Sequence, residues 1–453
     1  MGRVILLVAL LLGVAGAAAL LVVPEQPAIG LGLGVVAAVM VVSAPPRRRG
    51  PVRRPGARSR LMTRRGLLLA GLVVLVGGAA LFRRGELGRA AVASPAPTAT
   101  PSRGPLPRPT VRPAARGIWL SPDEIMALPT RTDAFHRLEE AAAADIRLDD
   151  ISYQDSRTPS HLMQVALVAA RRDDDRLRAV VRDAIVAAIG TEEGDTGEHQ
   201  ERNRPLGVGR NLPGYVIAAD LIGLGSFDRS ADVRFRSWID ELRTKRLRGR
   251  DRSLAEIEPL DHSNWSAHIS AALTAANLYL EDTAATRTSA DILLGWLGDP
   301  EGRQDWEYDT ERHDYSWMCH YPDVDRFLPV NPAGCERDGM VIDGIIPIDM
   351  QRGDGFRVPP TFTQYPRESL QGRTAQAEML YRAGFDTYTW ADRAILRIAE
   401  RQRAMGEAFD REWYEPRMGC YWIIARRTGA PFPLEEPSTG RSVSGVDWTH
   451  ARA

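Results

Sequence analysis

The sequence is poor in the residues and motifs that mark hydrolases, metalloenzymes and nucleotide-binding proteins. In 453 residues it has three Cys and eight His. It contains no Gly-x-Ser-x-Gly segment, which carries the nucleophile of many serine hydrolases, and no His-Glu-x-x-His segment of a zinc protease. Gly207 and Gly209 lack the third glycine and the preceding strand of a dinucleotide-binding loop. We therefore predict no cofactor and no zinc site.

Acidic residues and lysine are almost missing from the first 116 residues. This segment has 17 Arg, no Lys, and only Glu25 and Glu86 as acids. Because the whole chain has 58 basic and 58 acidic residues, the remainder carries 41 basic against 56 acidic residues. All ten Trp and all eight His also lie in this acidic part. Its net negative charge argues against nucleic acid as a partner.

Three apolar runs dominate the first 92 residues, at positions 5–23, 28–42 and 66–82. A helix needs about 20 residues to cross a bilayer core of roughly 30 Å, so the first run is long enough and the others are marginal. Arginines between the second and third runs place that connection in the cytoplasm by the positive-inside rule. Residues 1–92 are predicted to anchor the protein in a membrane, with the rest of the chain outside the cytoplasm.

The same region has a second interpretation. From Met62 the sequence MTRRGLLLAGLVVLVGGAAL has twin arginines followed by an apolar run, as in a twin-arginine export signal. If translation starts there, the first two spans are not made. Both interpretations export the remainder of the chain, to the cell surface or the periplasm.

Residues 93–116 differ in composition from the body, 117–453. The first segment consists mainly of Pro, Ala, Ser, Thr and Arg, so we expect a disordered linker. The body shows apolar residues at helical spacing and few strand patterns, which predicts an all-α fold. Short links pair several helices without a fixed sequence period, which favours a closed ring of helical hairpins, an α/α toroid. Helices are predicted at 121–128, 133–145, 160–172, 175–190, 212–224, 233–247, 264–280, 285–298, 368–384 and 389–406.

A long region from about residue 298 to 366 breaks the helical pattern, and loops of this length usually have a function. Its aromatic side chains offer flat faces for stacking on sugar rings, or they form a small core beneath the loop. They are Trp306, Tyr308, Tyr315, Trp317 and Tyr321, with His313 and His320 among them.

The same loop holds two of the three cysteines and four spaced aspartates. Cys319 and Cys335 are near enough in sequence for a disulfide in an oxidising compartment, and three unpaired thiols are the alternative. Calcium is only a weak alternative to having no metal, because the aspartates match no tight calcium-binding loop. The aspartates are Asp338, Asp343, Asp349 and Asp354.

The stretch DHSNWSAH, residues 261–268, puts polar side chains at the start of an apolar helix. With Asp261 or Ser263 as N-cap, the helix begins near Asn264, and Asn264 and His268 share one face. The free N–H groups of a first helical turn attract a carboxylate or another anion. The alternative is that Ser263 only caps the helix, His262 is exposed and His268 belongs to the core.

A second polar group precedes the helix predicted at 212–224. Arg210 and Asn211 stand just before it, and Tyr215 lies one turn inside. The planar guanidinium of arginine suits carboxylate binding, so Arg210 is a candidate for such contact. A surface ion pair is the alternative.

Several of these segments together resemble the alginate lyase-like polysaccharide lyases, whose fold is an incomplete α/α toroid. The resemblance covers the body from about Gly117 to His450. Its motifs are GIWLSPDEIMALPTRTDAFHRLEEAA, VRDAIVAAIGTE, GRNLPGYVIAADLIGL, HSNWSAHISAALTAANLYL and RESLQGRTAQAEML. The resemblance implies cleavage of uronic-acid polymers by β-elimination. In that reaction Asn, Arg or His neutralises the uronate carboxylate, and Tyr or His transfers protons.

The resemblance carries over only in part. The family's Asn-Asn-His segment falls on residues 263–265, which retains Asn264 and has Trp265 at the histidine position. The family's Glu-Leu-x-Arg-Gly segment falls on residues 368–372, where Gln371 replaces the arginine, and its downstream tyrosine falls on Glu378. Candidate replacements for the missing acid and base are Tyr365, Arg367, Tyr381 and His320.

The prediction from sequence is thus an anchored, extracytoplasmic lyase-like protein whose partner is an acidic polysaccharide. Asn264 and Arg210 are the predicted carboxylate neutralisers, His268 a neutraliser or base, and Tyr365 and Arg367 further catalytic groups. Substrate contacts are predicted for Asn211, Tyr215, His262, Trp265, Trp317, His320 and Tyr321. A glycoside hydrolase on the same architecture and a non-catalytic glycan-binding protein are the alternatives.

Overall fold

A computed structural model describes residues 117–194, 201–324 and 326–451 of the chain. The predicted membrane spans, the export signal and the linker lie outside the described residues. Within the described part, no helix is long and apolar enough to cross a membrane.

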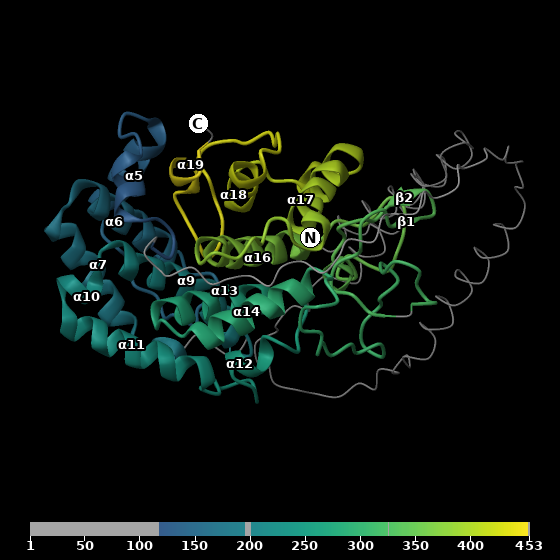
Figure 1. The fold of residues 1–453 in the computed structure, drawn as a ribbon, viewed down its shortest axis with the longest axis horizontal. Coiled ribbons are helices and arrows are strands. Elements are labelled where there is room, and N and C mark those ends of the chain that lie inside the picture. Colours follow the sequence, from purple (N-terminus) through teal and green to yellow (C-terminus); the bar gives the residue numbers. More distant parts are fainter. Residues whose placement is uncertain (1–116, 195–200, 325, 452–453) are drawn as a thin grey trace, which may run out of the picture. The chain divides into compact units, whose positions relative to one another are not determined.

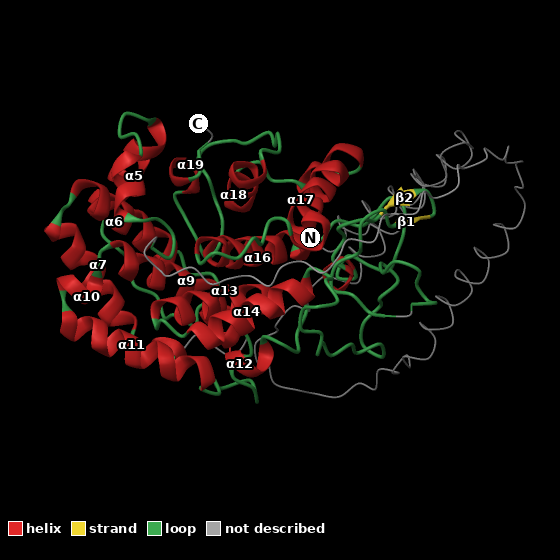
Figure 2. Cartoon of the chain, in the orientation of Figure 1, coloured by secondary structure: helices red, strands yellow, loops and turns green. Residues whose placement is uncertain are grey.

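The described chain is mostly helical, as the apolar spacing predicts (Figure 2). Its long helices are α5 (Asp133–Ala143), α6 (Thr158–Arg172), α7 (Asp175–Ala188), α9 (Arg204–Leu221), α11 (Arg229–Thr244), α13 (Asn264–Tyr279), α14 (Thr283–Trp296), α16 (Tyr365–Arg382), α17 (Trp390–Ala408) and α18 (Gly419–Thr428). Short helices are α4 (Pro122–Ala127), η1 (Thr191–Glu193), α10 (Leu224–Phe227), α12 (Leu254–Ile257), α15 (Pro347–Met350), η2 (Arg411–Trp413) and α19 (Val446–Thr449). Two strands, β1 (Glu336–Arg337) and β2 (Met340–Val341), form an antiparallel hairpin.

Helix contacts run in a circuit around the described body. Helices α6, α9, α13, α16 and α18 pack one against the next, and α18 contacts α19, which contacts α5 and thereby returns to α6 (Figure 1). Helices α7, α11, α14 and α17 pack against members of this first set. Trp296 at the end of α14 contacts His262 just before α13, and Gln402 of α17 contacts Pro366 at the start of α16, so these two pairs of successive helices are antiparallel.

Helix α13 is buried over nearly its whole length and packs against both α9 and α16. Its sequence is apolar or small on every side, and such a helix is stable only when it is surrounded. Ser263 is its N-cap and accepts a hydrogen bond from the backbone N–H of Trp265, so the predicted start at Asn264 is confirmed. The polar stretch therefore lies at the end of a buried helix.

Helix α9 begins eight residues before the predicted start at 212 and includes the two glycines that precede it. Glycine disfavours a helix interior, but here the close packing requires it. A Cβ atom on Gly207 would lie 2.0 Å from the carbonyl oxygen of Ser152, and one on Gly209 would lie 2.9 Å from the backbone nitrogen of Ile269. The prediction was wrong at this boundary because tertiary packing outweighs local propensity.

The long region between α14 and α16 contains β1, β2, α15 and otherwise irregular chain. Cys319 and Cys335 form a disulfide across it, with their Cα atoms 6.0 Å apart, while Cys420 is a buried thiol. A small separate core lies beneath the loop and includes Trp317 and Trp413. Of the five loop aromatics only Trp317 belongs to this small core, while Trp306 and Tyr315 belong to the main core and Tyr308 and Tyr321 pack against it.

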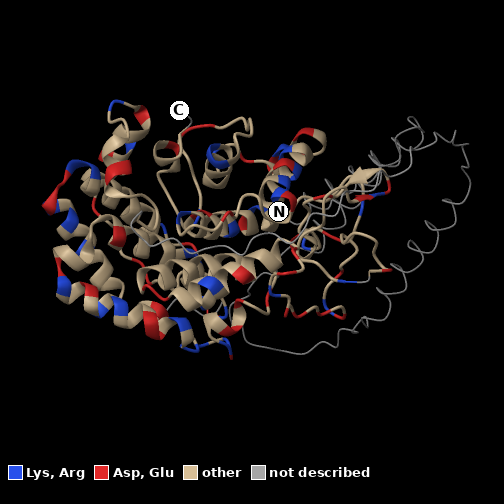
Figure 3. Ribbon diagram, viewed as in Figure 1, with Lys and Arg blue, Asp and Glu red and all other residues tan. Residues whose placement is uncertain are grey.

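Charges of both signs alternate on the outer helices (Figure 3). Arg178 pairs with Asp175 within α7, and Arg236 pairs with Asp232 within α11. Surface pairs of this kind contribute little stability, but they leave no large surface of one sign on these helices. The net acidity of the body is therefore spread out.

Candidate functional site

Three parallel helices meet near the start of α13. Cβ atoms on Gly209 of α9 and Gly372 of α16 would both collide with the α13 backbone, the second lying 2.5 Å from the carbonyl carbon of Ala267. These glycines bring both neighbours against the same turn of α13. The opposite ends of the three helices also lie together, since Asp220, Tyr279 and Met379 line one cavity.

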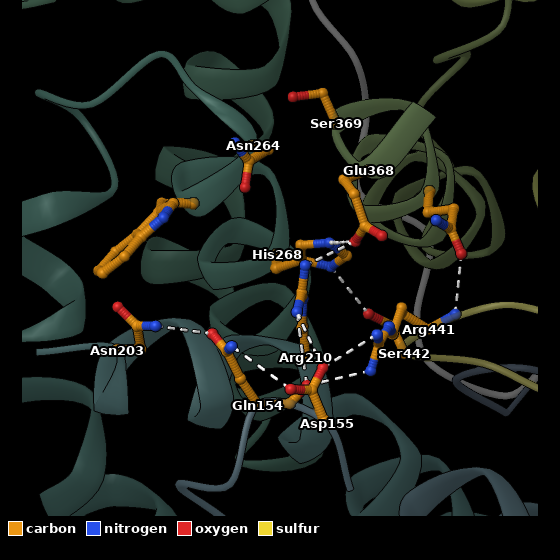
Figure 4. Close-up of polar contacts among 12 residues, drawn as sticks. Gln154, Asp155, Asn203, Arg210, Asn264, His268, Glu368, Ser369, Arg441 and Ser442 are labelled. Carbon is orange, nitrogen blue, oxygen red and sulfur yellow. Dashed lines mark hydrogen bonds and ion pairs between the residues drawn. The ribbon is translucent and has the colours of Figure 1, made fainter. Parts of the chain in front are cut away.

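This crossing joins Arg210, His268 and Glu368, one from each helix (Figure 4). Nη2 of Arg210 donates to Oε2 of Glu368 at 2.7 Å, and Nε2 of His268 lies 3.2 Å from the same oxygen. Burial alone would raise the pKa of Glu368, but the hydrogen bond from His268 and the positive charge of Arg210 lower it to about 2. Glu368 is therefore an ionised carboxylate at neutral pH.

The exposure of the three side chains is graded. His268 is fully buried, Arg210 is 9% exposed and Glu368 is 13% exposed. Solvent reaches this cluster from the side of Glu368 and Arg210. One donor of Arg210, its Nε–H, is buried without a hydrogen-bond partner among the described residues, which is costly unless a ligand oxygen meets it.

The ionised state of Glu368 determines which nitrogen of His268 carries the proton. Burial lowers the pKa of His268 to about 4, so the imidazole is neutral at pH 7 and has one donor and one acceptor. A carboxylate only accepts, so Nε2 donates to Glu368 and Nδ1 is left as an acceptor for the Ser442 hydroxyl at 3.2 Å. His268 is thus not oriented as a direct base for a bound ligand.

A second layer of polar residues encloses this cluster (Figure 4). Arg441 donates to the carbonyl oxygen of Gln154 at 3.1 Å and to Asp155 at 3.1 Å. The backbone N–H of Arg441 donates to Oε1 of Gln371 at 2.9 Å. The C-terminal segment and the loop before α6 are thereby tied to α16 beside His268.

Asn264 lies one helical turn from His268 and is held by Asp349. Its backbone and side-chain nitrogens both donate to Oδ1 of Asp349, at 3.3 and 3.2 Å, and the Ser369 hydroxyl donates to Oδ2. Burial raises the pKa of Asp349 to about 7 despite these hydrogen bonds. Asn264 is itself only 2% exposed, and its amide nitrogen is held by this fully enclosed carboxyl group.

Trp265, Tyr365 and Arg367 are partly exposed. The guanidinium of Arg250 lies 4.3 Å from the Trp265 ring centroid, and that of Arg352 lies 4.8 Å from the Tyr365 ring centroid. Arg367 lies 5.3 Å over the Phe362 ring. Tyr365 and Arg367 belong to the same first turn of α16 as Glu368, so the structure brings these candidates to one end of that helix.

Three residues predicted to contact substrate are buried and serve the interior instead. Asn211 donates to the carbonyl oxygens of Ile151 and Tyr153, both at 2.8 Å. Tyr215 is 1% exposed and belongs to the main core. His262, expected at the surface if it had no role, is buried against the rings of Tyr308 and Tyr315.

The loop residues do not form the predicted platform. Trp317 is 1% exposed and donates to the carbonyl oxygen of Asp354, so its faces are covered. His320 is exposed, and Tyr321 is partly exposed with Arg337 5.9 Å from its ring centroid. The four loop aspartates do not converge either, because Asp343 pairs with Arg397 while Asp349 faces Asn264. No cluster of His, Cys, Asp or Glu suited to a metal occurs in the described ranges.

Sequence reasoning missed the roles of Glu368, Ser442 and Asp349. In the sequence Glu368 stands out only through the resemblance and through its place in the first turn of a helix. Nothing in the sequence links Ser442 to His268. Glu378, where the resemblance would place a tyrosine, lies at the other end of α16, is fully buried and pairs with the partly exposed Arg427. The chain matches no protein-family model, no curated protein and no solved structure.

Proposed function

We propose that the body is an α/α toroid that binds a uronic-acid-containing polysaccharide outside the cytoplasm and cleaves it by β-elimination. The observation that carries this proposal is the convergence of donors from α9 and α13 on one carboxylate oxygen. A site that neutralises a uronate needs such donors, because removal of the C5 proton leaves enolate-like charge on the carboxylate. The helix circuit and the disulfide agree with a toroid in an oxidising compartment, and the apolar runs of the leader supply its membrane anchor.

The roles follow from which atoms remain for a ligand. Arg210, whose side chain is 9% exposed, neutralises the substrate carboxylate through its charge while Nη2 keeps Glu368 and the Nε–H is buried. Asn264, oriented by Asp349, supplies a further amide at the helix end. Tyr365, in the same helical turn as Glu368, transfers the proton, and His268 acts by holding Glu368 in place.

The direct test incubates the full-length protein, purified in detergent, with a panel of uronate polymers. β-Elimination creates a carbon–carbon double bond conjugated with the carboxylate, so ultraviolet absorbance rises as the polymer is cut. We expect that rise with at least one polymer, and a loss of at least about 100-fold in rate for Arg210→Ala. Arg210→Lys is the matched control that keeps the charge but loses the planar fork. A flat trace on every polymer would exclude a lyase.

A second candidate, glycan binding without cleavage, has its own supporting observation. Arg210 and His268 already contact Glu368, and Asn264 already contacts Asp349, so the predicted neutralisers have internal partners. In this case a polymer binds, Arg210→Ala weakens binding, and no absorbance develops. Release of reducing ends without the chromophore would instead indicate a hydrolase.

A further inference from the structure

Ser442 has an unusual backbone conformation beside the candidate site. It lies in the turn between Gly440 and Gly445 with φ of 69°, in the left-handed region that residues other than glycine rarely adopt. Strained residues of this kind cluster at active sites. The segment reads Gly-Arg-Ser-Val-Ser, so it departs from the nucleophile motif Gly-x-Ser-x-Gly only at its last position.

In the cluster of Ser442, His268 and Glu368, each hydrogen bond is donated toward the carboxylate of Glu368. Ionised Glu368 accepts from Nε2 of His268, and the remaining lone pair on Nδ1 faces the Ser442 hydroxyl. The proton that His268 is oriented to accept is therefore that of Ser442. A hydroxyl nucleophile, a neutral imidazole and an orienting carboxylate in this order make an activated nucleophile, whatever their positions in the sequence.

We propose that Ser442 is the nucleophile of an acyl-transfer site that hydrolyses carboxylic esters with short acyl groups. Oγ of Ser442 attacks the ester carbonyl carbon as its proton passes to Nδ1 of His268. The carbon–oxygen bond to the alcohol then breaks, and the alcohol leaves with that proton. Water attacks the acyl-serine in the same way, returning the proton to Oγ and releasing the acid. The acyl group is short because Ser442 is only 4% exposed.

Donors for the negatively charged intermediate lie in the same cluster. Oε1 of Gln371 is fixed as an acceptor by the backbone N–H of Arg441, so its NH₂ group is left to donate beside the turn that carries Ser442. Arg210 contributes the unpartnered Nε–H and its charge. Groups of this type stabilise an oxyanion when they are fixed in advance.

This inference does not depend on the proposed elimination. Both reactions use Arg210, but only elimination requires Asn264 and Tyr365, and only acyl transfer requires Oγ of Ser442. A reagent that bonds covalently to activated serines therefore tests the second activity without any polysaccharide, and failure of one proposal leaves the other intact.

The experiment treats the full-length protein in detergent with a small fluorophosphonate and locates the added mass by peptide mapping. We expect stoichiometric labelling of Ser442 in the unmodified protein, so the test does not require a variant to fold. Thr449 is an internal control, because its hydroxyl contacts Nδ1 of His450 beside Glu378 but its backbone lacks the left-handed conformation of Ser442. Absence of label, or label on another residue instead of Ser442, would overturn the proposal.

Variants then measure the contribution of each group to hydrolysis of 4-nitrophenyl acetate. Ser442→Ala abolishes turnover, and Glu368→Gln lowers it by at least about 100-fold because His268 loses its orienting carboxylate. Ser444→Ala is the matched control on the same turn, since the Ser444 hydroxyl accepts from Gln164, and it keeps full activity. Gln371→Glu keeps the acceptor for Arg441 and loses the donor, and we expect roughly a 100-fold loss. Equal turnover in Ser442→Ala and the unmodified protein would also overturn the assignment.

Discussion

Helix α16 carries two glutamates, Glu368 and Glu378, and each is bound by an arginine and a histidine. Glu368 meets Arg210 and His268, and Glu378 meets Arg427 and His450. Each histidine also contacts a hydroxyl group through Nδ1, at 3.2 Å in the first cluster and 2.8 Å in the second. The two ends of one helix thus hold the same four kinds of group.

The clusters differ in how completely the carboxylate is enclosed. Glu378 is fully buried, and both of its oxygens accept from Arg427 while Oε2 also accepts from Tyr388 at 3.1 Å. At Glu368 one oxygen receives both partners, and the side chain keeps an exposed edge. The Glu378 cluster is therefore a structural ion-pair cluster in which both carboxylate oxygens are occupied. The Glu368 cluster has the same residue types, but solvent reaches one side of its carboxylate.

The largest expected effect on stability comes from removing the carboxylate of Glu378. Glu378→Gln breaks an ion pair whose carboxylate is fully buried, although the Arg427 side chain is 22% exposed, and we expect a loss of about 3–5 kcal/mol in the free energy of unfolding. Glu368→Gln, the matched change at the other end of α16, costs about 1–3 kcal/mol because water replaces part of the lost contact. Denaturant unfolding of both variants measures the difference. Equal losses of stability would mean that the Glu368 cluster contributes as much to the free energy of unfolding as the Glu378 cluster.

The next effect is a pH dependence of stability at Asp349, opposite in sign to the one expected at Glu378. Asp349 has a folded-state pKa raised by burial to about 7, so its stabilising contribution is present at low pH and is lost as pH rises toward 7. Asp349→Asn mimics the neutral form, keeping an acceptor for Asn264 and a partner for Ser369. Relative to the unmodified protein, the variant should gain roughly 2 kcal/mol between about pH 5 and pH 7.

Unfolding curves at several pH values test this sign. The charged neighbour that contributes to the shift is Asp261, which also raises the pKa of Asp349. A difference between variant and unmodified protein that does not change with pH would show that Asp349 titrates normally. Glu378→Gln should have the opposite sign, since the pKa of Glu378 is lowered by Arg427 and His450 and its contribution disappears only in acid.

The smallest expected effect on stability lies at the exposed rim. The guanidinium of Arg250 lies 4.3 Å from the Trp265 ring centroid, and that of Arg427 lies 4.5 Å from the Tyr381 ring centroid in the Glu378 cluster. Arg250→Ala should cost about 0.5–1 kcal/mol of stability, because exposed cation–π contacts are weak. If Trp265 borders the polysaccharide site, the same variant weakens polymer binding more than it weakens folding. Thermal unfolding and binding titrations separate the two effects.

Much of the secondary structure could be predicted from local patterns. Ser263 caps α13 as expected, because a hydroxyl that accepts from the first free N–H groups needs only neighbouring residues. The start of α9 could not be found in this way. Gly207 and Gly209 normally weaken a helix, and only contact with Ser152 and with α13 makes them favourable there.

The residues of the candidate site could likewise be predicted from the sequence only in part. Arg210 and His268 could be selected from their residue types and places near helix ends, and the structure brings them together. Tyr215 and Trp317 have equally suitable residue types, but burial removes both from contact with a ligand. Exposure depends on the whole fold, because it is set by what packs on a side chain and not by its neighbours in sequence.

By itself the sequence determined a mostly helical body, the start of α13 and the residue types available for carboxylate chemistry. All of these depend on interactions within a few turns of chain. Only the tertiary structure decided that Glu368 joins Arg210 to His268, that His268 faces Ser442, and that Glu378 is closed while Glu368 is open. These contacts link residues far apart in the chain, and they form because glycines let three helices approach to backbone contact.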